Sequence, residues 1–271
     1  MAFDIETYKD RSRKLELDDI CWGDVRRHPL PAGAIESMLY MMDIETHTVI
    51  FLSELLVSKA CMDPVITSFL SIWVYEEMYH GEAFARFLRE YGVYVPDDRP
   101  QQVRLQEGLH RVIAVLTVLA GSYVLPFFPA VYLTIGAVNE MTTLTGYEQL
   151  IRRAHHPVLT EILERIIKQE RVHFAFYRSQ AHRLLAESRT ARRANRWIME
   201  RRFKAVGEGV KPAEDVDRLA LYLFDGEDGR EAVRRIDRAA QRLPGLNGVR
   251  LLERVLDRAE CHVRNSTSPV L

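Results

Sequence analysis

Apolar residues recur every three or four positions along most of the chain, and this spacing predicts long helices. The first runs from about Ala34 to Ala60 without a helix-breaking residue. The second begins at Asp63-Pro64, where Asp suits the cap and Pro the first turn, and it stops at Gly92. Three further helices are expected, at about 103–125, 130–154 and 158–186. Because no convincing strand lies between them, the pattern predicts an all-α fold built as a helical bundle.

The predicted helices divide the chain into three parts. Residues 1–35 mix charge, Gly and Pro and are expected to form an N-terminal arm. Residues 36–204 contain the bundle and end in a basic run, 189–204, with seven Arg or Lys against one Glu. Residues 205–271 form a polar, mainly helical C-terminal extension, with expected breaks at Gly226, Gly229 and Pro244-Gly245.

One long apolar stretch tests whether the chain spans a membrane. No charged residue lies between Val112 and Asn139, and a transmembrane helix needs about 20 such residues. However, Pro126 and Pro129 lie in the middle of the stretch, and proline ends or kinks a helix. We therefore expect two core helices that meet near these prolines, and no membrane span.

Composition adds limits on partners and compartment. The 271 residues, 47% of them hydrophobic, suffice for a sizeable core. Lys and Arg (37) nearly balance Asp and Glu (38), so charge gives no support for a nucleic-acid partner. The three cysteines form no CxxC pair, so neither a zinc ribbon nor a rubredoxin-like centre is expected. Sparse cysteines and a polar N-terminus without a secretory signal favour a cytoplasmic protein.

The candidate chemistry lies in two segments, 77–80 and 170–173, that share the pattern Glu-x-x-His. Residues three apart share a helix face, so each segment can offer a carboxylate and an imidazole to one point. Each segment also has a glutamate on the preceding helix, at nearly the same distance from the intervening turn. The candidate metal ligands are therefore Glu45, Glu77, His80, Glu140, Glu170 and His173.

Packing the two helical hairpins together brings four glutamates and two histidines into one core. That is the ligand set of carboxylate-bridged di-iron or di-manganese bundles. Two divalent ions balance four carboxylates, whose burial without cations would be very costly. Oxygen and imidazole ligands favour iron or manganese over metals that prefer thiolates.

Two other assignments are weaker. Glu54 is an alternative to Glu45, but it lies too near the turn to meet Glu77. A third Glu-x-x-His segment, at 107–110, lacks an equivalent glutamate on a short antiparallel neighbour. We expect that segment to lie on the surface.

The motifs resemble those of the ferritin-like superfamily, and within it those of the soluble acyl-carrier-protein desaturases. The first desaturase motif reads approximately W-x-x-E-E-N-R-H-G, and residues 73–81 read WVYEEMYHG. The second reads approximately D-E-K-R-H, and residues 169–173 read QERVH. Their lone helix glutamate lies in a Q-E-R-A-T run, and residues 139–143 read NEMTT. The resemblance covers about residues 36–186 and implies a ferritin-like four-helix bundle with an extra long helix and a helical C-terminal extension.

The resemblance also implies roles for single residues. It makes the six candidates ligands of two iron ions, or manganese in their place, with Glu77 and Glu170 as bridges. Thr143 matches a threonine beside the oxygen-binding face that helps to deliver protons. The structural alternative for Thr143 is a buried threonine bonded to a helix carbonyl. Gln169 departs from the family pattern, because an acidic residue linked to electron or proton delivery stands there in the desaturases.

The function implied is that of a non-haem di-iron oxidase. It would use O2 as co-substrate and electrons from an external donor such as ferredoxin, and would desaturate or hydroxylate an acyl chain or another hydrophobic substrate. The basic run could dock an acidic acyl carrier protein, although a solvated helix face is the simpler interpretation. Four aromatic residues could line an acyl channel or simply pack in the core, namely Tyr123, Phe127, Phe128 and Tyr132. The resemblance further implies a homodimer.

Three other functions stay open. One is a di-iron N-oxygenase or hydroxylase of a specialised biosynthetic pathway, although Leu163 stands where N-oxygenases carry an additional histidine. Another is a non-catalytic iron-binding protein or ferroxidase, which the long extension does not suit. The third is radical oxidation of Tyr147 or Tyr177, for which we expect supporting or core roles.

Overall fold

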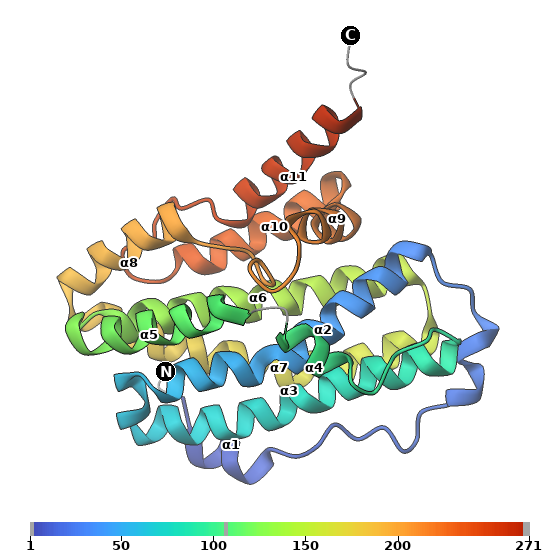
Figure 1. Cartoon of the computed structure of the whole chain (residues 1–271), viewed down its shortest axis with the longest axis horizontal. Helices are drawn as coiled ribbons and strands as arrows, with labels where there is room; N and C mark the ends of the chain where they lie inside the picture. The colour runs from blue at the N-terminus through green and yellow to red at the C-terminus, as the bar shows by residue number, and fades with distance from the viewer. Residues whose placement is uncertain (1–2, 106–107, 268–271) are drawn as a thin grey trace.

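The computed structural model describes residues 3–105 and 108–267, which form helices and no named strand. Four long helices lie side by side in it (Figure 1). They are α2 (Ala32–Leu56), α3 (Pro64–Tyr91), α6 (Phe128–Ala154) and α7 (Pro157–Glu187). Helix α2 packs along α3 and α6 along α7, while contacts of α2 with α6 and of α3 with α7 join the two pairs. The prediction of an all-α fold is therefore confirmed.

Local residues explain where the long helices begin and end. Asp63 caps α3 by accepting hydrogen bonds from two backbone amides of the first turn, which Pro64 opens. Gly92 ends α3 in the left-handed conformation, at φ 103°. His155 ends α6 in the same conformation, and the ring of His156 caps α7. These boundaries agree with those predicted from sequence.

The end of α2 differs from the prediction. The helix expected over residues 34–60 stops at Leu56, and a short 3₁₀ helix, η2 (Lys59–Met62), follows. The hydroxyl of Ser58 accepts a hydrogen bond from the amide of Ala60 and so caps the new turn.

The long apolar stretch does not lie wholly in the core. The described parts of the helix expected over 103–125 are α4 (Arg99–Leu105) and α5 (Gly108–Val124). The described side chains of α5 are largely exposed, including Leu116 at 58% and Tyr123 at 56%. The prediction of two core helices is thus right for α6 and wrong for α5. None of the described helices combines the length and apolar character needed to cross a membrane.

The N-terminal residues cover one side of the long helices. Helix α1 (Ile5–Arg11) and the 3₁₀ helix η1 (Trp22–Arg27) lie along α3, and η1 also contacts α7. Figure 1 shows them on the side away from the C-terminal helices. Tyr8 of α1 is buried, so the arm packs directly on the long helices.

The C-terminal residues cover the opposite side with four helices (Figure 1). These are α8 (Arg189–Arg202), α9 (Ala213–Phe224), α10 (Gly226–Gln241) and α11 (Leu252–Thr267). Helix α9 packs on α2 and α6, and α10 packs on α6. The extension is mainly helical, as predicted.

Glycines mark the breaks in this extension, with one exception. Gly226, the first residue of α10, and Gly245, which lies between α10 and α11, both adopt positive φ. Gly229 lies inside α10, so the break predicted there is wrong. A Cβ at Gly229 would lie 2.2 Å from the carbonyl oxygen of Phe224, so only glycine allows α10 to begin so close to the end of α9.

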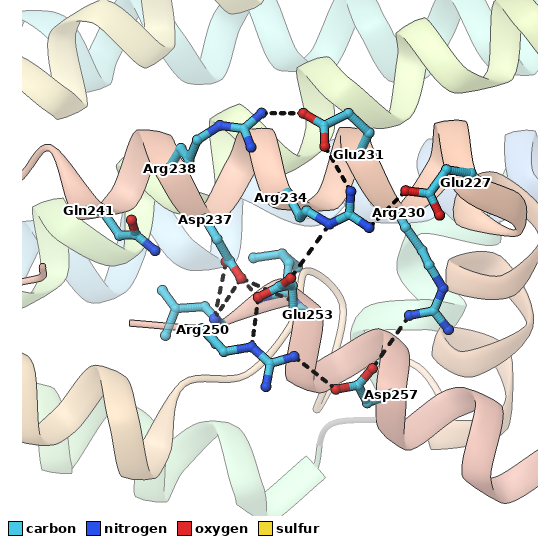
Figure 2. A network of polar contacts seen from close by, with 12 residues as sticks. Glu227, Arg230, Glu231, Arg234, Asp237, Arg238, Gln241, Arg250, Glu253 and Asp257 are labelled. Atoms are coloured by element: carbon cyan, nitrogen blue, oxygen red, sulfur yellow. Dashed lines mark hydrogen bonds and ion pairs between the residues drawn. The ribbon is translucent and has the colours of Figure 1, made fainter. Parts of the chain in front are cut away.

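A polar network joins α10 to α11 (Figure 2). The buried carboxylate of Asp237 accepts hydrogen bonds of 2.9 to 3.2 Å from the backbone amides of residues 251–253. Arg250 pairs with Glu253 at 2.7 Å and with Asp257 at 3.2 Å. A side chain of α10 thus caps the first turn of α11 and fixes where that helix starts.

Candidate metal centre

The four long helices each turn an acidic residue toward the space between them. Glu45 lies on α2, Glu77 on α3, Glu140 on α6 and Glu170 on α7. His80 and His173 follow Glu77 and Glu170 by one helical turn, on the same faces. All six residues are buried, and none is more than 6% exposed. The structure therefore brings together every residue that the sequence nominated as a metal ligand.

The six side chains form two overlapping groups. In each group, one oxygen or nitrogen atom from every member lies within 4.8 Å of the others. The groups are Glu45, Glu77, His80, Glu170 and Glu77, Glu140, Glu170, His173. Glu77 and Glu170 belong to both. The arrangement offers two metal positions, each with its own histidine and glutamate, and two glutamates between them.

The shared glutamates each face both histidines. His80 Nδ1 lies 3.3 Å from Glu77 Oε2 and 3.1 Å from Glu170 Oε1. His173 Nδ1 lies 3.0 Å from the other oxygen of Glu77 and 3.5 Å from the other oxygen of Glu170. Each shared carboxylate thus turns one oxygen toward each candidate metal position, as a bridging carboxylate does.

The atoms that face the centre lack other partners. Both histidine Nδ1 atoms and both carboxylate oxygens of Glu170 are buried without a hydrogen bond among the described residues. Buried polar atoms are normally paired, and leaving them unpaired costs free energy. Metal cations would satisfy all four, so the residues present fit a pair of metal ions.

The electrostatics of the cluster also demand positive charge. Burial raises the pKa of Glu45 well above its usual range, and the charges of Glu77 and Glu170 raise it further. Burial and the same two neighbours raise the pKa of Glu140. For His80, burial lowers the pKa, but the carboxylates of Glu170 and Glu77 outweigh burial and raise it to about 10. Cations between the carboxylates would relieve this mutual repulsion.

Hydrogen bonds from outside the cluster orient both imidazoles. His173 Nε2 lies 2.7 Å from Glu76 Oε2, and His80 Nε2 lies 2.8 Å from Gln169 Oε1. Both partners accept, so Nε2 carries a ring proton and Nδ1 is the nitrogen that would bind a metal once its own proton is lost. Glu76 also accepts a hydrogen bond of 2.8 Å from the hydroxyl of Tyr8.

Sequence reasoning assigned no role to Glu76 or Tyr8. Glu76 stands beside Glu77 in the first motif, and a second acid within an apolar helix is a signal that would have found it. Tyr8 lies 68 residues from Glu76, and nothing in its local sequence indicates the contact. Gln169, noted as a departure from an acidic residue, still accepts from a histidine but carries no charge.

Two further side chains bond to Glu45 and Glu140. We call these two the outer glutamates, because each belongs to only one of the two groups. Trp73 Nε1 donates a hydrogen bond of 3.1 Å to Glu140, and the hydroxyl of Tyr147 donates to Glu45. Tyr177 instead packs its ring edge-on against Trp73 in an aromatic cluster. Tyr147 and Tyr177 therefore have the supporting and core positions expected of them.

The alternative assignments have clear outcomes. Glu54 accepts a hydrogen bond from the hydroxyl of Tyr132 at 3.2 Å and belongs to neither group. Glu45 is therefore the member that α2 contributes. The third Glu-x-x-His segment lies outside the residues whose side chains are described.

A cavity reaches the cluster, and we call it the entrance cavity. Its lining includes both the four buried glutamates of the cluster and the exposed residues Arg202 and Lys204. None of the four aromatic residues considered for an acyl channel lines it. Tyr132 packs on Phe51 and Phe128 in the core instead, and Tyr123 is exposed.

Thr143 also lines the entrance cavity. Its neighbours Thr142 and Thr145 donate their hydroxyl protons to helix carbonyls at 2.8 and 2.7 Å. No such bond from Thr143 is found in the described part of the chain. Thr143 therefore lies at the wall of the cavity that reaches the cluster.

Comparisons of the chain with family models, with curated proteins and with solved structures find no match. The ferritin-like resemblance is therefore carried by the motifs alone. The buried Glu and His cluster is consistent with it, because that cluster suits a carboxylate-bridged pair of metal ions.

Proposed function

We propose that this chain is a ferritin-like, carboxylate-bridged di-iron protein that uses O2 to oxidise an apolar substrate. The observation that carries the proposal is that Glu77 and Glu170 each turn one oxygen toward each histidine. Unrelated buried acids have no reason to adopt this symmetry. Oxygen and imidazole ligands suit iron, or manganese in its place.

When bound, two iron ions would supply the electrons that reduce O2 and the oxidising power needed to remove hydrogen from a C–H bond. The chain's own residues do the remaining work. Glu76 and Gln169 orient the imidazoles, while Trp73 and Tyr147 hold the outer glutamates. Thr143, which lines the entrance cavity, would hold or pass a proton there.

The entrance cavity supports an oxidase over an iron-storage protein, because an oxidase must admit an organic substrate to its metal ligands. Whether the product is a desaturated or a hydroxylated chain depends on which C–H bond the cavity presents. We further propose that electrons come from an external donor such as ferredoxin. An acidic carrier protein would meet Arg189 and Arg193, which are exposed, since Arg192 and Arg196 already bond to backbone carbonyls.

Anaerobic loading with ferrous iron tests this function. The unmodified chain should retain about two irons and give a transient absorption band on exposure to O2. Glu170→Gln should retain one iron or fewer, because it removes a shared carboxylate. Glu54→Gln is the matched control, since Glu54 is a glutamate of α2 outside both groups, and it should retain two.

Two results would contradict the proposal. One is a chain that retains no iron. The other is a control variant that loses as much iron as Glu170→Gln does. Iron oxidation without substrate, in a large hollow assembly on gel filtration, would instead support the storage alternative.

A further inference from the structure

The C-terminal helices close a second cavity against the long helices. It lies between α2 and α6 on one side and α9, α10 and α11 on the other. We call it the C-terminal cavity. Met41 and Gly146 contribute to its floor, and Leu219, Leu223 and Val255 to its roof.

The C-terminal cavity adjoins the entrance cavity beside the candidate metal centre. Five residues line both, namely Ile44, Glu45, Thr143, Ala205 and Val206. Glu45 belongs to the metal cluster, and Thr143 follows Glu140 by three residues on α6. A molecule that occupied both cavities would pass directly beside the metal ligands.

The walls of the C-terminal cavity suit an uncharged hydrocarbon. Among its lining residues only Glu45 carries a charge, and the hydroxyl of Tyr147 donates to it. The hydroxyl of Tyr40 donates to a backbone carbonyl at 2.6 Å, and that of Thr142 does so at 2.8 Å. A polar group of a ligand would therefore be desolvated with few partners, which opposes its binding.

The roof of the cavity is fixed in place. Leu252 and Val255 line it from α11, whose first turn is capped by Asp237 of α10 (Figure 2). The ion pair of Arg230 with Asp257, at 3.6 Å, ties the two helices together one turn further on. A wall held in this way needs little ordering when a ligand binds.

We propose that the C-terminal cavity binds the aliphatic end of the substrate, so that the C-terminal extension sets how long a chain the metal centre accepts. The part that concerns oxidation rests on the proposed function. The binding of an aliphatic chain does not depend on the proposed function, because the cavity requires no metal. The two ideas can therefore fail separately.

Gly146 offers a substitution that narrows the cavity without disturbing the fold. A Cβ at Gly146 would lie 3.5 Å from Met41 Cε and 3.6 Å from Leu223 Cδ1, which are ordinary contacts. Alanine also favours a helix interior over glycine. Gly146→Ala should therefore hold or raise the melting temperature while it fills part of the cavity, and Gly146→Val should fill more.

The test measures 1-decanol binding to the metal-free full chain by isothermal titration calorimetry. We expect saturable binding to the unmodified chain, binding at least about tenfold weaker for Gly146→Ala, and weaker still for Gly146→Val. The diol 1,10-decanediol should bind at least about tenfold more weakly than 1-decanol, because its inner hydroxyl finds no partner. Gly121→Ala is the matched control, since its Cβ would meet Phe128 at 3.5 and 3.6 Å far from the cavity. It should bind 1-decanol normally.

The proposal is overturned if the unmodified chain does not bind 1-decanol, or if the Gly146 variants bind it as tightly as the unmodified chain does. It is also overturned if 1,10-decanediol binds as tightly as 1-decanol. Iron loading of the same proteins separates the two ideas. Retention of iron without 1-decanol binding would contradict only this inference, and 1-decanol binding without iron would contradict only the proposed function.

Discussion

Single residues outside the cluster decide how the two histidines are presented. His173 donates to Glu76, a carboxylate, whereas His80 donates to Gln169, a neutral amide. An anionic acceptor makes an imidazole a stronger electron donor to a metal than a neutral acceptor does. The two candidate metal positions therefore have similar ligands but differ in the group that accepts from Nε2 of the histidine. That group is a carboxylate for His173 and an amide for His80.

Glu76→Gln tests this contribution. The substitution keeps the shape but removes the charge beside His173, so we expect metal affinity to fall by roughly 10- to 100-fold. Competition against a chelator of known affinity would measure the change. Glu82→Gln, an exposed residue of the same helix, is the control and should bind metal like the unmodified chain. Equal affinity for all three proteins would mean that Glu76 does not tune the site.

Sequence alone identified the six candidate metal ligands but not the residues next to them, Glu76 and Tyr8. Helical spacing places Glu77 with His80, and Glu170 with His173, on single faces, so those pairs follow from local geometry. The contact of Tyr8 with Glu76 depends on how the N-terminal arm packs on α3. No local pattern encodes such packing.

Among the helices, α5 is the element that the sequence described least well. Its composition resembles that of a buried helix, yet its described side chains are largely exposed in the single chain. The ends of α3, α6 and α7 were predicted correctly, because capping residues and glycines act over only a few neighbouring residues. Burial of a whole helix is instead decided by what packs against it.

A second copy of the chain is the partner we expect for α5. Four exposed residues of α5 are apolar, namely Ile113, Leu116, Tyr123 and Val124, so an identical face could cover them with apolar surface. Leu116→Glu should therefore convert a dimer into a monomer in light-scattering measurements. Trp197→Glu is the control, because Trp197 is equally exposed but lies on α8. A monomeric unmodified chain would rule out the dimer.

At the scale of the molecule, the cluster is covered from two sides by segments with no predicted chemistry. The N-terminal arm supplies Tyr8 on one side, and the C-terminal extension supplies the roof of a cavity on the other. The sequence predicted helices in the extension, but the cavity exists only because α9 to α11 fold back onto α2 and α6. No single sequence motif predicts such long-range packing.

The most direct test of the central claim is a crystal structure of the iron-loaded chain, with data collected at the iron absorption edge. The account predicts two anomalous peaks about 3.5–4 Å apart. Glu77 and Glu170 should lie between them, and each peak should contact Nδ1 of one histidine. A single peak, or iron bound elsewhere with the six side chains still unliganded, would contradict it.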